Sequence, residues 1–501
     1  MMDGEFWYGS CVKYGRKMPF SESTREIVDF TQNQTPNQAM PLLVSSKGRA
    51  VWRNTGFQAE FDAGILRVPD DCIICREGKT LRDAYLGAAR RWFPFSGKAP
   101  AEELFSGILY NTWIELTFYQ TQKAVLEYAE KILEAGMPAG VIMIDDGWSE
   151  CYGDWRFHSG KFPDPENMLR KLKVMGFHVM VWICPYLSAD SVKYREAEEL
   201  GILVKNPDGE TYIARWWNGY SAVLDFSNPE AAVWMKKQLD ALCEMGVDGF
   251  KFDAGDSIYY RNDNVTFGGV TPDEQSRLWA EFGAQYSFNE YRVTFRAGGM
   301  PLLQRLCDKD HSWGDSGIAS LIPDLLLQGI TGHPYGCPDM IGGGEYRNFQ
   351  EIENSGLDQE LFVRHSEIAC LMPAMQFSAA PWRVLDEEHF RAVLRSVKVR
   401  KQYLPYLMEK VRQACRTGEP VIRYMAYEFP EEPVETLTDQ FMLGEKYLVA
   451  PVWKKGQKGR QVYLPRGVWK RGDTRIESKG ETVYCDSCPG EPIVLERELK
   501  Q

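Results

Sequence analysis

The sequence predicts an α/β protein: a (β/α)8 TIM barrel with a short β domain before it and a β-sandwich domain after it. Between residues 101 and 412, strand patterns alternate with helix patterns, and eight strands can be counted. VIMI (141–144) and VMVWI (179–183) are apolar throughout, as is typical of parallel strands covered by helices on both faces. The 501 residues exceed the roughly 250–300 that one hydrophobic core normally serves, so several domains are expected.

Residues 1–100 are predicted to form an abbreviated β-sandwich. In MPLLVSSKGRAVWRNTGF (40–57), apolar and polar residues alternate around a Lys-Gly turn. A short helix, LRDAYLGAARRWF (81–93), stops before Pro94. The polar segment SGKAPAEE (96–103) is therefore the predicted domain boundary.

The barrel is assigned to residues 101–412. Amphipathic helices are predicted between its first strands, and NPEAAVWMKKQLDALCEMG (228–246) combines a proline suited to the first turn with a glycine suited to the C-terminal cap. The predicted strands lie within GILYNTWIEL (107–116), AGVIMIDDGW (139–148), FHVMVWICPYL (177–187), VDGFKFDAGD (247–256), YRVTFRAGG (291–299), the DHSWGD region (310–315), GITGHPYGCPDMIG (329–342) and CLMPAMQFS (370–378).

Residues 413–501 return to strands and turns and are assigned to a second β domain. Its strand candidates are EPVIRYMAYEF (419–429), KYLVAPVWKKG (446–456), RQVYLPRGVWKRG (460–472) and ETVYCDSCPGEPIVLERE (481–498).

The acidic balance of the chain argues against nucleic acid or a membrane surface as its main partner. The formal net charge is −12, with 70 acidic and 58 basic residues. No run approaches the roughly 20 apolar residues of a membrane span, and MMDGEFWYGSCVKYGRK lacks the apolar core of a signal peptide. We therefore expect a cytoplasmic protein with a small-molecule substrate, and a homo-oligomer remains possible in this interpretation.

The 12 cysteines are expected to be reduced thiols. Two pairs have CxxC spacing, Cys72 with Cys75 and Cys485 with Cys488, and would supply four zinc ligands if the chain ends met. Free thiols are the favoured alternative, so no metal and no cofactor is expected.

The strand VDGFKFDAGD combines apolar and charged residues. Because side chains alternate along a strand, Lys251 and Asp253 share one face while Phe250 and Phe252 share the other. If the phenylalanines pack against helices, Asp253 points into the barrel mouth, where chemistry is carried. A nearby ammonium keeps such a carboxylate ionised and nucleophilic. A purely structural Lys-Asp ion pair is the alternative.

Further carboxylates follow other predicted strands. Asp145 and Asp146, close to Trp148, suit the hydroxyls and the apolar face of a sugar, and a magnesium or calcium site is the alternative. Asp315 in HSWGDSG is expected near the mouth, although a turn aspartate is an equal possibility. Two carboxylates, one ionised and one with a raised pKa, are what glycoside hydrolysis needs.

An ordered series of motifs from about residue 40 to the end resembles glycoside hydrolase family 31, the retaining α-glycosidases. The motifs are PLLVSSKGRAVW (41–52), GDWRFHSGKFPDPENM (153–168), VDGFKFDAGD (247–256), SWGD (312–315), PDMIGG (338–343), RKQYLPYL (400–407), DQFMLGEKYLVAPV (439–452) and RQVYLPRGVW (460–469). The resemblance implies an exo-acting enzyme with Asp253 as nucleophile and Asp315 as acid/base. It also implies that a sugar contacts Asp145, Asp146, Trp216, Lys251, Arg296, Trp313 and Asp339.

The motifs KFDAGD, IDDGW and RWWNG are similar to those of a family branch that includes an α-galactosidase, so an α-galactoside is the expected substrate. An α-glucosidase, an α-xylosidase, a transglycosylase and a non-catalytic sugar-binding protein on the same barrel stay open. The first 100 residues are short for the family. We therefore expect a loop that closes the pocket to be missing or to come from another subunit.

Overall fold

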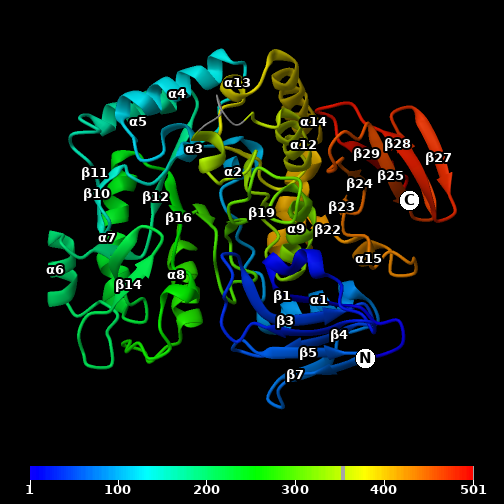
Figure 1. Ribbon diagram of the computed structural model, residues 1–501, viewed down its shortest axis with the longest axis horizontal. Coiled ribbons are helices and arrows are strands. Elements are labelled where there is room, and N and C mark those ends of the chain that lie inside the picture. The colour runs from blue at the N-terminus through cyan, green and yellow to red at the C-terminus, as the bar shows by residue number, and fades with distance from the viewer. Residues whose placement is uncertain (351–355, 500–501) are drawn as a thin grey trace.

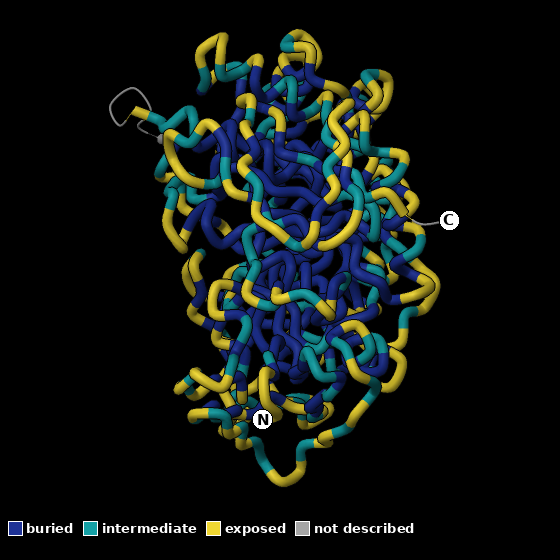
Figure 2. The backbone as a smooth tube through the Cα atoms, turned by 90° about the vertical axis from the view of Figure 1, so that its right-hand side faces the viewer, coloured by how far each residue is buried: buried dark blue, intermediate teal, exposed yellow. Residues whose placement is uncertain are grey.

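The computed structural model describes residues 1–350 and 356–499. It contains a barrel, N-terminal antiparallel sheets that lie below it in Figure 1, and a C-terminal β domain to its right. Figure 2 shows buried backbone through the interior of the molecule and exposed backbone around its edges. In the described part of the chain, no helix has the length and apolar character needed to cross a membrane.

Two antiparallel sheets form the N-terminal part. The 3-10 helix η1 (Val12–Lys17) follows the first strand and packs against a barrel helix, α9. The helix α1 (Leu81–Trp92) begins with a capping box, in which Thr80 and Asp83 each accept a hydrogen bond from the other's backbone N–H. One sheet has the order β1 (Trp7–Cys11), β3 (Ala39–Ser45), β4 (Arg49–Trp52) and β7 (Ile73–Arg76); the other has β2 (Arg25–Asp29), β5 (Gln58–Asp62) and β6 (Ile65–Arg67).

Eight parallel strand positions close the barrel, which confirms the predicted fold class. The seventh position is broken: β19 (Gly336–Cys337) pairs with β18, whereas β20 (Met340–Ile341) pairs with β21. Pro338 and Asp339 form the break, and Asp339 has a positive φ of 65°. The other strands are β8 (Leu109–Asn111), β9 (Val141–Ile144), β12 (His178–Ile183), β16 (Gly249–Phe252), β17 (Phe288–Tyr291), β18 (Leu303–Arg305) and β21 (Gln376–Phe377).

Two barrel strands differ from the prediction. The strand β17 ends where the predicted strand 291–299 begins, and β18 ends before the predicted region 310–315. The extended residues after β17 pair elsewhere: the Ala39 N–H donates to the Thr294 carbonyl, and the Arg296 N–H donates to the Ala39 carbonyl, both at 2.9 Å. The strand-like pattern of 291–299 is therefore satisfied by the N-terminal sheet and not by the barrel.

Helices surround the barrel (Figure 1). The longest, α14 (Glu387–Thr417), runs past the predicted boundary at residue 412 because its left-handed C-cap, Gly418, lies beyond it. The others are α4 (Gln122–Glu134), α5 (Pro165–Val174), α6 (Val192–Glu199), α7 (Pro229–Met245), α8 (Pro272–Gly283), α9 (Leu321–Ile330) and α12 (Gln359–Ala369), with short helical turns α2 (Glu103–Ser106), α3 (Trp113–Leu116), η2 (Ser257–Tyr259), η3 (Ile318–Ser320), α10 (Arg347–Gln350) and α13 (Pro381–Val384).

Small antiparallel sheets extend from the barrel, and a β domain follows it. The β10 (Ser149–Cys151) and β11 (Asp154–Phe157) hairpin follows β9, and β13 (Tyr186–Ser188), β15 (Gly219–Val223) and β14 (Ile213–Trp216) form a sheet beyond β12. The C-terminal domain contains α15 (Met425–Glu428), a sheet in the order β22 (Ile422–Arg423), β23 (Phe441–Leu443), β24 (Tyr447–Ala450), β29 (Ile493–Arg497), β26 (Gly467–Arg471) and β27 (Thr474–Ser478), and the pair β25 (Gly459–Leu464) with β28 (Glu481–Asp486).

The outward face of β16 is aromatic, as the alternation predicted. Phe252 stacks on Tyr291 with ring centroids 4.8 Å apart and meets Trp279 of α8 edge-on at 5.2 Å. Phe250 meets Tyr286 at 5.0 Å. This packing fixes the register of β16 and directs Lys251 and the following Asp253 toward the barrel interior.

Truncating the packed ring should destabilise the barrel. We expect Phe252→Ala to lower the free energy of unfolding by about 3–5 kcal/mol, since a buried ring is lost and its neighbours cannot close the space. Phe267→Ala is the matched control, because Phe267 is 72% exposed whereas Phe252 is 1% exposed. Urea denaturation of both variants gives the comparison, and equal effects would contradict this account of the packing.

Candidate active site

A cavity of about 530 Å³ opens at the carboxyl ends of the barrel strands. We call it the mouth cavity. Residues in or just after β9, β12, β16, β17, β18 and β20 contribute to it, and Lys13 and Pro36 reach it from the N-terminal part of the chain. Its charged and aromatic lining includes Asp145, Asp146, Trp182, Trp217, Lys251, Asp253, Asp256, Arg292, Arg305 and Asp308.

Asp253 lies directly after β16 and is held on both carboxylate oxygens. The Trp182 indole donates to Oδ2 at 3.0 Å. Oδ1 accepts from Arg292 Nε at 2.9 Å and from the Ala254 N–H at 2.8 Å. Burial alone would raise the pKa of Asp253, but the positive charges of Arg292, Lys251 and Arg305 outweigh it and hold that pKa well below its ordinary value. The carboxylate is therefore ionised throughout the neutral and mildly acidic range.

Arg292 is fixed in turn by three other groups. Its Nη1 and Nη2 donate to the two oxygens of Asp256 at 3.0 and 2.7 Å, and Nη1 also donates to the Pro36 carbonyl at 2.9 Å. The guanidinium carbon lies 5.0 Å from the ring centroid of Trp217. Because each part of the guanidinium has a partner, Arg292 presents one defined orientation to Asp253.

Lys251 pairs with Asp145 and not with Asp253. The distance from Lys251 Nζ to Asp145 Oδ2 is 2.6 Å, and both side chains are buried. Burial lowers the pKa of Lys251, but the negative charges of Asp145, Asp253 and Glu290 together outweigh it and the pKa is raised. Asp145 is oriented by its own backbone N–H, which donates to the Thr112 hydroxyl at 2.9 Å. The pair therefore places an ammonium and a carboxylate together in the wall of the mouth cavity.

Asp146 is the neighbouring acidic group. Its Oδ2 accepts from the Tyr152 hydroxyl and from Asn218 Nδ2, both at 2.8 Å. Burial raises the pKa of Asp146 to about 6, and the Asp145 charge adds to this rise, although the hydrogen bonds from Tyr152 and Asn218 oppose it. Asp146 therefore changes protonation at mildly acidic pH.

Arg305, at the end of β18, contacts three further carboxylates, those of Asp308, Asp339 and Glu290. Its Nη1 lies 2.7 Å from Asp308 Oδ1 and 2.5 Å from Asp339 Oδ1, and its Nε lies 3.5 Å from Glu290. Burial raises the pKa of Asp339 to about 7 despite the Arg305 charge. The Asp308 side chain is 46% exposed, whereas Asp339 lies wholly behind the cavity wall.

The structure does not bring Asp315 into the mouth cavity. Its side chain is 71% exposed and pairs with Arg16 of η1 at 2.9 Å. The physical reason is that β18 ends at Arg305, so the residue that follows this strand at the mouth is Asp308. The carboxylate that lines the mouth cavity after β18 is therefore Asp308 and not Asp315.

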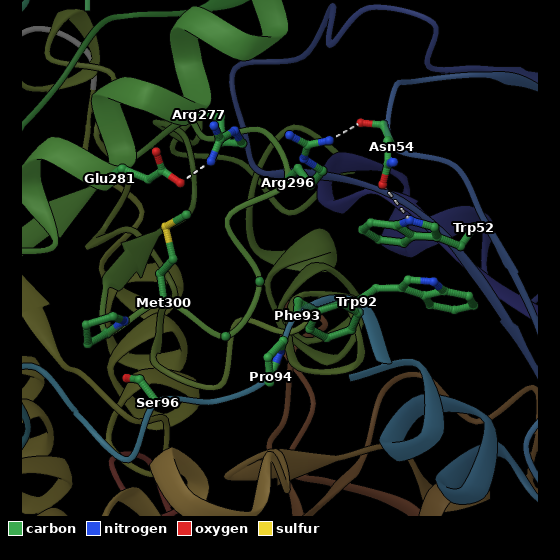
Figure 3. Close-up of a pocket in the computed structure, with 13 residues that line it drawn as sticks. Trp52, Asn54, Trp92, Phe93, Pro94, Ser96, Arg277, Glu281, Arg296 and Met300 are labelled. Atoms are coloured by element: carbon green, nitrogen blue, oxygen red, sulfur yellow. Dashed lines mark hydrogen bonds and ion pairs between the residues drawn. The ribbon is translucent and has the colours of Figure 1, made fainter. Parts of the chain in front are cut away.

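Four predicted sugar contacts also lie outside the mouth cavity, namely Trp216, Arg296, Trp313 and Asp339, the last of which is buried behind the cavity wall. The Trp216 indole donates to the Ser221 hydroxyl at 3.0 Å, while Trp217, beyond the end of β14, lines the cavity. Arg296 lines a different cavity, shown in Figure 3. The strand β17 ends at Tyr291, so Arg292 and not Arg296 follows it at the mouth. Trp313 donates to Asp358 at 2.9 Å.

Of the predicted residues, Asp145, Asp146, Lys251 and Asp253 line one cavity. Sequence reasoning missed Trp182, Trp217, Asn218, Arg292 and Asp308. Trp182 ends the apolar run VMVWI, and Asp308 follows LQR, a strand of three residues that is too short for any periodic signal.

No group of three or more His, Cys, Asp and Glu side chains within residues 1–350 and 356–499 is arranged to hold a metal ion. Cys75 lies in β7 and Cys485 in β28, in different domains. The two CxxC pairs therefore do not form a four-ligand zinc site in the described structure.

A (β/α)8 barrel with carboxylates and aromatic side chains around a cavity at its strand ends has the architecture of the barrel glycoside hydrolases. Residues 105–298 match the model of the glycosyl hydrolases family 31 TIM-barrel domain, and residues 418–493 match the model of the family 31 C-terminal domain. The chain belongs to glycoside hydrolase family 31.

The chain is 36% identical over 409 residues to the myogenesis-regulating glycosidase of Mus musculus, covering 79% of this chain and 57% of that protein. It is 26% identical over 367 residues to the sulfoquinovosidase of Escherichia coli strain K12, covering 69% and 53%. It is also 26% identical over 481 residues to the α-xylosidase XylQ of Lactiplantibacillus pentosus, covering 88% and 59%. The chain thus spans little more than half the length of these relatives.

Solved structures share the fold. A Flavobacterium johnsoniae family 31 dextranase complexed with glucose superposes with a TM-score of 0.84 at 20% identity, covering 99% of this chain and 66% of that one. A family 31 sulfoquinovosidase from E. rectale, complexed with an aza-sugar inhibitor, gives 0.84 at 19% identity, covering 99% and 81%.

Replacing Asp146 should change how stability depends on pH. The folded-state pKa of about 6 lies above the ordinary value of 3.8, so between these values the folded protein keeps a proton that the unfolded chain releases. The contribution of Asp146 to the free energy of unfolding therefore falls as pH rises from about 4 to 6. Asp146→Asn should lack this contribution, and its stability relative to the wild type should improve by about 3 kcal/mol over that interval. Urea denaturation at several pH values tests this, and a constant difference would contradict it.

Proposed function

We propose that the protein is an exo-acting hydrolase that removes a terminal α-linked sugar in two displacement steps with net retention. The observation that carries the proposal is that the ionised, buried Asp253 and the more accessible Asp308 line one cavity at the barrel mouth. A retaining glycosidase needs this combination of a nucleophilic carboxylate and a proton donor.

In the first step, Asp253 attacks the anomeric carbon and the glycosidic C–O bond breaks. Oδ1 of Asp253 accepts two hydrogen bonds and Oδ2 accepts one, so we assign the attack to Oδ2. Asp308 gives its proton to the departing oxygen, and the sugar becomes a β-linked ester of Asp253. Asp308 then takes a proton from water, which attacks the same carbon and releases both the sugar and the Asp253 carboxylate.

The surroundings of Asp308 support its role as the proton donor. Arg305 Nη1 contacts both Asp308 and Asp339, so the charge of one guanidinium is shared between two carboxyl groups. Burial raises the pKa of Asp339 to about 7, so a carboxyl group that keeps its proton near neutral pH shares this guanidinium with Asp308.

Asp253→Asn should abolish hydrolysis of nitrophenyl α-glycosides, since an amide cannot form the ester intermediate. Asp263→Asn is a control, because Asp263 lies on the surface and pairs with Arg261. Activity is measured by nitrophenol release, and circular dichroism checks the fold. A cyclophellitol-type probe should label Asp253 of the wild type, and its attachment to another residue would refute the assignment.

Asp308 and Asp315 give a matched test of the acid/base assignment. Asp308→Ala should lower kcat/KM about 10²–10⁴-fold for substrates with poor leaving groups and much less for dinitrophenyl glycosides, which leave without a proton. Azide should restore turnover in this variant and form an α-glycosyl azide. Asp315→Ala should retain activity, because Asp315 lies outside the mouth cavity. The reverse pattern would return the role to Asp315.

An α-galactoside is the sugar that we propose. Support comes from the motifs KFDAGD and IDDGW, which the structure brings together as the Lys251–Asp145 pair with Asp146 beside it. This group offers donors and acceptors for neighbouring sugar hydroxyls.

A panel of aryl α-glycosides tests the choice: galactoside, glucoside, xyloside, N-acetylgalactosaminide and sulfoquinovoside. The highest kcat/KM is expected for the galactoside. A higher value for another sugar would contradict the proposed substrate and put that sugar in its place. Product analysis at high acceptor concentration separates hydrolysis from glycosyl transfer, which is the alternative suggested by the 23% identity to an isomaltosyltransferase of Sporosarcina globispora.

A further inference from the structure

A second cavity, of about 590 Å³, lies between the N-terminal sheets and the outside of the barrel. We call it the lateral cavity. It is formed by β4 and the residues after it, the end of α1, the helix α8 and the segment 292–302 that joins β17 to β18. None of its lining residues also lines the mouth cavity.

One wall of the lateral cavity is polar and its charges are balanced. Arg277 Nε donates to Glu274 Oε1 at 2.7 Å, and Arg277 also pairs with Glu281. Arg296 pairs with Glu274 at 3.0 Å and donates to the Asn54 carbonyl. Two guanidinium groups thus face two carboxylates, with the side chains of both arginines only about one-fifth exposed. Figure 3 shows Arg277 and Arg296 on the same side of the cavity.

The backbone at Arg296 is unusual. Its φ is 48°, in the left-handed region that a residue with a long side chain rarely adopts. The conformation is held by the Arg296 N–H, which donates to the Ala39 carbonyl, and it directs the guanidinium to the lateral cavity. Strained residues of this kind concentrate at binding sites, where the surrounding structure compensates for their cost.

Most of the remaining lining is apolar. Trp92 stacks on Trp52 with centroids 5.2 Å apart and planes 6° from parallel. Phe93, Pro94 and Met300 complete this surface, and Figure 3 shows Phe93 and Pro94 opposite the two arginines.

We propose that the lateral cavity binds a neutral saccharide unit, as a second sugar site distinct from the mouth cavity. Paired guanidinium and carboxylate groups supply adjacent donors and acceptors for vicinal hydroxyls, while the aromatic and proline side chains pack against the apolar face of a sugar ring. An anion fits less well, because it would have to compete with Glu274 and Glu281 for both arginines.

The site would hold one part of a substrate while another part is cut. Arg292, which orients Asp253, and Arg296 lie four residues apart on one segment, and each belongs to one of the two cavities. A saccharide tethered at the lateral cavity therefore raises the local concentration of its other end near the same barrel.

The test uses Asp253→Asn protein, so that bound saccharide is not turned over. Crystals are soaked with melibiose and with isomaltose, and calorimetry measures binding of the same sugars. We expect sugar density against Arg296 and Glu281. We also expect a binding event in calorimetry that Arg296→Ala weakens about tenfold or more, the scale of a lost hydrogen bond to a charged group. Arg261→Ala, which removes an arginine paired at the surface, should leave this event unchanged.

Two further variants keep the test decisive if Arg296→Ala disturbs the fold. Glu281→Gln keeps the shape of the wall, and Ser96→Trp fills the cavity from an exposed position; both should weaken binding at the lateral cavity. The absence of sugar density there, or binding that no variant changes, would overturn the proposal, as would binding of sulfate in place of both sugars. Hydrolysis by the wild type is measured separately, so this proposal and the proposed function can fail independently.

Discussion

Compensation of buried charge at the barrel mouth is the constraint on which the site depends. Asp145, Asp253 and Asp339 are all buried, and an isolated buried carboxylate would be neutral or destabilising. Lys251, Arg292 and Arg305 each pair with one of them. Because the three cations come from β16, from just after β17 and from β18, closing the barrel and assembling the charges are one event. The same pairs that make burial tolerable also set the direction of each carboxylate.

The carboxyl groups around the cavity differ in the number of cations that stabilise their ionised forms. Asp253 is surrounded by three cations that stabilise its ionised form, whereas Asp308 and Asp339 share one. Asp146 has no cation as a partner in the described structure and is held by neutral hydrogen-bond donors from Tyr152 and Asn218. One small volume therefore contains carboxyl groups with very different proton affinities, which is what acid/base chemistry requires.

The part of the fold that the sequence predicted well is the part with strong local patterns. The run VIMI and the alternation of GFKFD specify β9 and β16, and with them Asp145, Asp146, Lys251 and Asp253. Prediction failed where strands are short or where an extended segment pairs outside the barrel. The pattern YRVTF is strand-like, yet Thr294 and Arg296 bond to Ala39, a residue more than 250 positions earlier in the chain. No local pattern contains that contact, so the sequence placed Arg296 and Asp315 at the mouth, where the structure has Arg292 and Asp308 in the cavity lining.

The contact between Pro36 and Arg292 has a consequence for how the protein is divided. One carbonyl from the N-terminal segment completes the set of partners that orient Arg292, and Lys13 of η1 reaches the same cavity. A barrel excised at residue 101 would keep all eight strands but lose a ligand of its central guanidinium. The unit that holds Arg292 in this orientation is therefore larger than the barrel, and chimeras between relatives should exchange the N-terminal segment and the barrel together.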